Sequence, residues 1–109
     1  MPYDEHLAQR VRALLAHHPA LVEKKMFGGI AFMLNGNMFC GVVKDDLMVR
    51  VGAERFEEAL SKPHSRPMDF TGRPLRGFVY VDPAGHGSDV ALTEWVRRGL
   101  DFAASLLPK

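Results

Sequence analysis

With 109 residues, of which 47% are hydrophobic and 25% charged, the chain has the composition of a soluble globular protein and the length of one domain, residues 1–109. This composition excludes disordered and collagen-like proteins, and no apolar run is long enough to cross a membrane. The formal net charge is +1 and both halves of the chain are nearly neutral, so no basic block predicts strong nucleic-acid binding through counterion release.

The first predicted element is an amphipathic helix over residues 4–17. Asp4 is a suitable N-cap, and Pro19 ends the helix because the residue before a proline is disfavoured in the α region. The apolar positions follow the spacing of one buried helix face: Leu7, Val11, Leu14 and Leu15.

Three strands are predicted next, over residues 23–34, 37–43 and 47–51. Asn35 and Gly36 form a hairpin turn, since both central positions of a type I′ turn favour positive φ. Gly28 and Gly29 fall inside the first predicted strand, where glycine is costly. We therefore expect a β-bulge there, or a close approach by another backbone or ring.

The second half predicts a helix over residues 52–61, strands over 67–70 and 75–81, and a last helix over 89–107 with Ser88 as its N-cap. The order is helix, three strands, helix, two strands, helix. Because the links between successive strands are too short for parallel crossovers, we expect an α+β fold with a mainly antiparallel sheet and helices against one face.

The strands over residues 26–34 and 38–43 have apolar side chains on both faces, although a sheet with one solvated face should alternate. The second face must therefore be covered. Either a second copy of the chain associates across that face or over an edge strand, or the terminal helix wraps round to cover it. We favour a homodimer.

The single cysteine, Cys40, can form neither an internal disulfide nor, alone, a zinc site. It lies in an apolar strand, so we interpret it as a small buried side chain. A lone cysteine fits a reducing cytoplasm, and the N-terminus lacks the pattern of a signal peptide. The sequence therefore predicts a cytoplasmic protein without a membrane contact.

Several short motifs together resemble the N-terminal domain of the TfoX/Sxy family, named for regulators of bacterial competence. They are Lys25-Met26-Phe27-Gly28-Gly29, Met38-Phe39-Cys40-Gly41, Asp46-Leu47, Arg50-Val51, Phe56, Pro67-Met68, Arg73-Pro74, Tyr80-Val81 and Trp95-Val96. The resemblance extends from about Leu7 to Leu106. It implies a secretion-chaperone-like α+β domain in a bacterial, cytoplasmic, non-enzymatic protein. The longer regulators continue into a C-terminal helical domain, so we expect here a standalone TfoX-N-like protein.

No residues have the spacing of a catalytic or metal site. His17 and His18 are adjacent, so on a helix their side chains diverge, and no two histidines have ligand spacing. Gly28 and Gly29 do not lie between a strand and a helix, as a phosphate-binding loop requires. We therefore expect no catalytic residue, metal or cofactor, and a protein that is not an enzyme.

Basic and aromatic residues alternate near the predicted sheet, as they do in platforms on which single-stranded nucleic acids stack. In the simpler interpretation, the aromatic side chains face the core and Arg76 solvates a strand end. With the two glycines, these residues form the candidate interaction surface: Lys24, Lys25, Phe27, Gly28, Gly29, Arg50, Arg73, Arg76, Phe78 and Tyr80. The preferred function is a non-catalytic module that associates with itself or with a regulatory protein; the alternative is weak nucleic-acid binding, related to competence or transcription.

Overall fold

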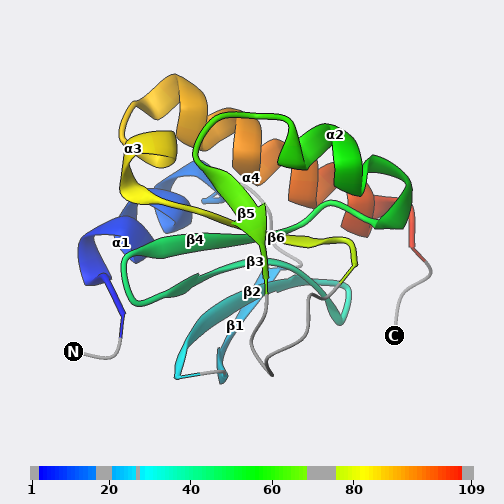
Figure 1. Cartoon of the computed structure of the whole chain (residues 1–109). Helices are drawn as coiled ribbons and strands as arrows, with labels where there is room; N and C mark the ends of the chain where they lie inside the picture. The colour runs from blue at the N-terminus through cyan, green and yellow to red at the C-terminus, as the bar shows by residue number, and fades with distance from the viewer. Residues whose placement is uncertain (1–2, 17–20, 27, 69–75, 107–109) are drawn as a thin grey trace.

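The computed structural model describes residues 3–16, 21–26, 28–68 and 76–106. Figure 1 shows the helices on one side of a single sheet. In chain order the elements are α1 (Glu5–Leu14), β1 (Leu21–Met26), β2 (Gly29–Leu34), β3 (Asn37–Val43), β4 (Asp46–Arg50), a 3₁₀ turn (Ala53–Arg55), α2 (Phe56–Leu60), β5 (Ser65–Pro67), β6 (Phe78–Val81), α3 (Pro83–His86) and α4 (Asp89–Ala104).

The six strands form one antiparallel sheet in the order β1-β2-β3-β4-β6-β5, which confirms the predicted α+β class. The predicted N-caps are also confirmed: Asp4 Oδ1 accepts from the backbone N–H groups of His6 and Leu7, and Ser88 Oγ accepts from that of Ala91. The predicted stop at Pro19 and the residues between the strands predicted over 67–70 and 75–81 lie outside the described residues.

The prediction of one continuous strand over residues 23–34 is wrong. β1 and β2 are separate strands that pair as a hairpin, with Met26 opposite Gly29, and Gly28 lies in the turn with a φ of +73°. A turn, rather than a bulge, therefore explains the first glycine. The second glycine fits the expected close approach of another backbone, because a Cβ on Gly29 would lie 2.0 Å from the carbonyl oxygen of Val42.

Helix α4 packs closely on the centre of the sheet. A Cβ on Gly99 would lie 2.4 Å from the carbonyl oxygen of Phe39, so only glycine permits this approach. The pairing of β2 with β3 shifts by one residue between Phe32 and Met33. Phe39 therefore has no residue of β2 directly opposite it. As a result, Phe39 and its neighbour Cys40 are both fully buried in the main hydrophobic core.

The short helix α3 was not predicted, because its four residues are too few to show a helical period. Asp82 caps it by accepting from the backbone N–H of Gly85, with proline in the first turn. The buried His86 joins α3 to the turn between β3 and β4 through a 3.0 Å hydrogen bond between Nε2 and the carbonyl oxygen of Asp45. This contact fixes α3 against the sheet.

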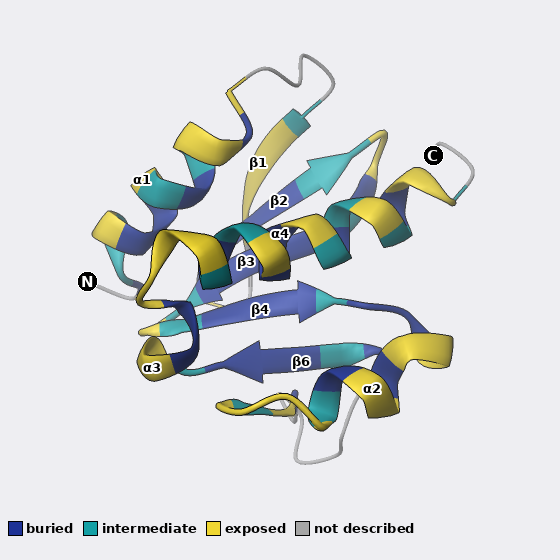
Figure 2. Cartoon of the chain, turned by 90° about the horizontal axis from the view of Figure 1, so that it is seen from above, coloured by how far each residue is buried: buried dark blue, intermediate teal, exposed yellow. Residues whose placement is uncertain are grey.

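The alternative in which the terminal helix covers the second face of the sheet is not what the described structure shows. α4 contacts β3 and β4 from the side on which α1 lies, and no helix of the described part covers the opposite side. On that side Met48 and Met68 are fully buried and pack with Tyr80. Figure 2 shows how buried β4 and β6 are in comparison with β1, which is largely exposed.

Candidate functional site

The sheet face opposite the helices, which we call the second face, brings together four residues of the candidate interaction surface. Cross-strand partners place Lys24, Arg50, Phe78 and Tyr80 on it, because they align with other second-face positions. One row of partners crosses the whole sheet: Lys24, Ala31, Gly41, Met48, Tyr80 and Arg66. Two of the predicted aromatic residues and two of the cations therefore share one face.

Of the other six residues, the four that the structure describes add no further aromatic or basic side chain to this group. Lys25 points to the face opposite that of Lys24, since neighbours in a strand alternate. Gly28 lies in the β1–β2 turn, Gly29 is buried, and Arg76 is exposed in the turn before β6. The remaining two, Phe27 and Arg73, lie outside the described residues.

The aromatic rings of the second face are already in contact with cations of the same chain. The Arg66 guanidinium lies 5.0 Å from the centre of the Tyr80 ring, and Arg50 lies 5.4 Å from Phe78 and 5.1 Å from Phe102. Arg66 also donates a hydrogen bond to Asp46 at 2.6 Å, and this bond raises the pKa of the arginine. Since these rings have partners, the geometry does not assemble a free stacking platform, and nucleic-acid binding stays a prediction.

Strand β1 is the most exposed part of the sheet. Its position at one end of the strand order leaves one of its edges without a partner strand within the described residues. From Val22 to Lys25 every side chain is exposed, and Val22 has 56% of its surface accessible. The ion pair between Arg12 and Glu23, at 2.8 Å, joins the strand to α1 and raises the pKa of the arginine.

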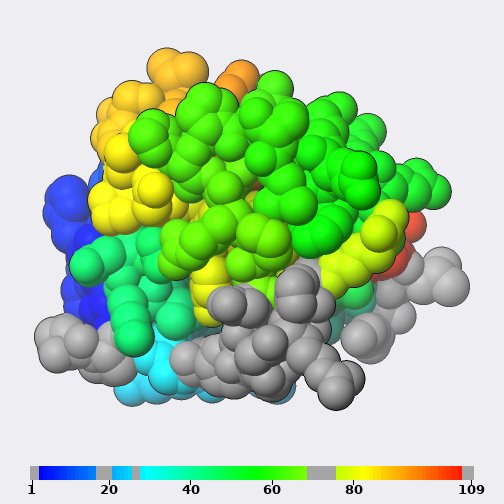
Figure 3. All heavy atoms as spheres, in the orientation of Figure 1, coloured from blue at the N-terminus to red at the C-terminus, as the bar shows by residue number. Residues whose placement is uncertain are grey.

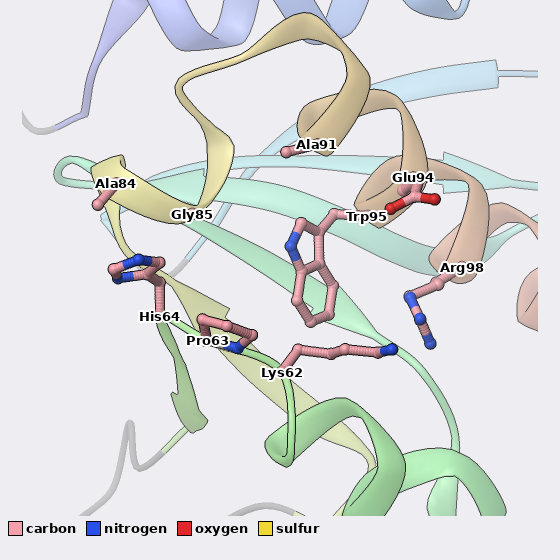
Figure 4. A pocket seen from close by; sticks show the side chains of 9 residues that line it. All are labelled: Lys62, Pro63, His64, Ala84, Gly85, Ala91, Glu94, Trp95 and Arg98. Carbon is pink, nitrogen blue, oxygen red and sulfur yellow. The ribbon is translucent and has the colours of Figure 1, made fainter.

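A groove of about 270 Å³ lies on the helical side, between the α2–β5 connection, α3 and α4. In the space-filling view the connection and α3 form adjoining parts of one surface (Figure 3). The ring of Trp95 faces into this hollow, which we call the Trp95 groove (Figure 4). The side chains around the ring include Lys62, His64, Ala84, Glu94 and Arg98.

Ionic contacts fix one wall of the Trp95 groove. Arg98 lies 5.4 Å from the Trp95 ring and donates to Glu58 at 2.9 Å, which lowers the pKa of that carboxyl. Sequence patterns provide no reason to group the residues of the Trp95 groove, because they come from the α2–β5 connection, α3 and α4, which only the fold brings together. From the sequence alone, a single tryptophan on the apolar face of an amphipathic helix is predicted to be a core residue.

The groups capable of covalent or metal chemistry are dispersed. Burial raises the pKa of the Cys40 thiol well above its ordinary value, so the thiol stays protonated at neutral pH. His64 Nδ1 lies 3.5 Å from Asp82, whereas His86 is buried with its Nδ1 unpartnered. Among the described residues no group of three or more histidine, cysteine or acidic side chains could hold a metal ion.

In the part of the chain that the structure describes, the fold is a small α+β arrangement in which α1 to α4 lie on one face of an antiparallel sheet. The model of the TfoX N-terminal domain family matches residues 13–103, and the chain therefore belongs to this family. Searches of curated proteins and of solved structures give no match. Within the described residues no helix is both long and apolar enough to cross a membrane.

Proposed function

We propose that this protein is a non-catalytic interaction module that associates with a second copy of itself through strand β1. The observation that supports this proposal is the outer edge of β1, which no other strand of the described residues pairs with; β1 has six residues and no proline. Such an edge presents unpaired backbone N–H and C=O groups that can pair with another strand. The second face is less suited to association, because Met48 and Met68 are already buried within one chain.

A symmetric pair of antiparallel β1 strands places each residue opposite a residue of the second copy. With the two-fold axis at Lys24, Glu23 of each copy lies opposite Lys25 of the other, which gives two opposite-charge pairs on the helical side. Both side chains are exposed and can meet, although Glu23 also forms the ion pair with Arg12 of its own chain. An axis at Glu23 places two glutamates opposite each other and forms no such pair, so charge favours the axis at Lys24.

This arrangement has one unfavourable contact, the two Lys24 side chains that face each other on the second face. Cross-strand charge pairs contribute about 0.2–1 kcal/mol each, so two attractive pairs outweigh one repulsion of similar size. Main-chain hydrogen bonds along the paired edges supply the rest of the attraction. Because the ion pairs are exposed, association weakens as the salt concentration rises.

The proposal is tested by sedimentation equilibrium over a wide range of concentration at low salt. The wild-type chain should form a dimer, whereas Glu23→Lys and Lys25→Glu should each shift the equilibrium to monomer, because each places like charges opposite one another. The matched control is Arg97→Glu, which reverses an exposed charge on α4 and should leave the dimer unchanged.

Two results would contradict the proposal. A wild-type monomer at every concentration would show that Lys24 and Lys25 protect the edge from association, as lysines do on many edge strands. A dimer that survives both charge reversals would show that the contact lies elsewhere.

The non-catalytic part of the proposal is supported by the dispersed chemistry, above all by the protonated, fully buried Cys40. A single buried thiol also fits a reducing cytoplasm. Membership of the TfoX N-terminal domain family supports a role for the dimer in bacterial regulation, with a further protein as its partner.

A further inference from the structure

We propose that the Trp95 groove binds a free α-amino acid with an apolar side chain. This inference is independent of the dimer, because none of the groove residues belongs to β1. The groove of about 270 Å³ accommodates a molecule of this size, and it opens beside the indole ring of Trp95, most of which is packed in the core. Figure 4 shows the ring between residues of the α2–β5 connection and of α4.

Two opposite charges border the groove without pairing with each other. Within the described part of the chain neither Lys62 nor Glu94 forms an ion pair, although the neighbouring Arg98 is held by Glu58. They come from different elements, and their charged ends are separate in Figure 4. An ammonium and a carboxylate placed in this way complement a zwitterion, whose carboxylate would meet Lys62 and whose ammonium would meet Glu94.

The remaining lining combines apolar residues with two polar side chains that already lie against carboxylates, Arg98 against Glu58 and His64 against Asp82. Pro63, Ala84 and Ala91 line the groove beside the indole, and the two alanines have only methyl groups there. Apolar surface removed from water between these residues and the ring supplies attraction, and the two charged contacts supply orientation. The chemistry therefore specifies the amino-acid backbone at one end and an aliphatic or aromatic side chain at the other.

Trp95 provides a direct readout, because it is the single tryptophan of the chain. Titration with leucine or phenylalanine should change its fluorescence in a saturable manner. N-acetyl-leucine lacks the ammonium and leucinamide lacks the carboxylate, so each should bind about tenfold more weakly, as expected for the loss of one hydrogen bond to a charged group.

Substitutions assign each half of the ligand to its residue. Lys62→Met should make leucine and leucinamide bind equally, and Glu94→Gln should make leucine and N-acetyl-leucine bind equally. Arg97→Met and Glu57→Gln remove exposed charges outside the groove and should preserve both preferences. The proposal is overturned if no amino acid gives a saturable change, or if the acetylated and amidated compounds bind as tightly as leucine.

Discussion

The two edges of the sheet differ in how they are protected. β5 has three residues, ends at Pro67 and lies against α2, where Ser65 Oγ donates to the carbonyl oxygen of Ala59 at 2.8 Å. β1 has six residues and exposed side chains from Val22 to Lys25. Short strands, prolines and covering helices are the usual means of preventing edge pairing. Among the described residues these features occur at one edge only, and this difference is the basis of the proposed pairing at the other edge.

The largest effect should come from Met68→Ala at the protected edge. Met68 is fully buried in the second-face cluster, and its backbone N–H donates to the carbonyl oxygen of Phe78. Loss of its side chain should lower the free energy of unfolding by about 2–5 kcal/mol, measured by urea denaturation.

The matched change at the open edge is Val22→Ala, which should alter the stability of the monomer by less than about 0.5 kcal/mol because Val22 is largely exposed. If Met68→Ala and Val22→Ala lowered the free energy of unfolding by similar amounts, the two edges would not differ in the way described.

A smaller effect is expected from Arg66→Ala, also at the protected edge. This side chain is 49% exposed and joins β5 to its neighbours through Asp46 and the ring of Tyr80. An exposed ion pair and a cation–π contact together should contribute about 1 kcal/mol to stability. Arg97→Ala, with no such contacts in the described structure, serves as the control and should unfold like the wild type.

The smallest expected effect is on association. Lys24→Ser removes the repulsion between the two lysines that face each other at the proposed axis. The dimer should tighten by about 0.2–1 kcal/mol, up to a fivefold decrease in the dissociation constant. Weaker association of this variant would mean that Lys24 makes an attractive contact and that the axis lies at another residue.

The sequence predicted most elements because their signals are local. Asp4 and Ser88 are caps next to amphipathic stretches, and Asn35-Gly36 lies in a two-residue turn between strands. The β1–β2 turn was missed because its apolar neighbours hide the change of direction. In that segment the pair Gly28-Gly29 is a turn signal, but two adjacent glycines also fit a bulge.

The sites were harder to predict than the elements. Whether Lys24 and Lys25 belong to an edge strand depends on the strand order, which requires contacts between distant segments. The Trp95 groove likewise joins Lys62 to Glu94, which lie on elements far apart in the chain. No pattern within either segment indicates the other, so such a site appears only when the fold is known.

The central claim, that two copies pair through β1 around Lys24, is tested most directly by mixing two variants. The Glu23→Lys variant has lysine at positions 23 and 25, and the Lys25→Glu variant has glutamate at both. Each variant alone should therefore be monomeric in sedimentation equilibrium. The mixture should form a heterodimer, because both pairs between positions 23 and 25 then have opposite charges, while the Lys24 pair is the same as in the wild type. If the wild type dimerises but the mixture remains monomeric, the proposed register is contradicted.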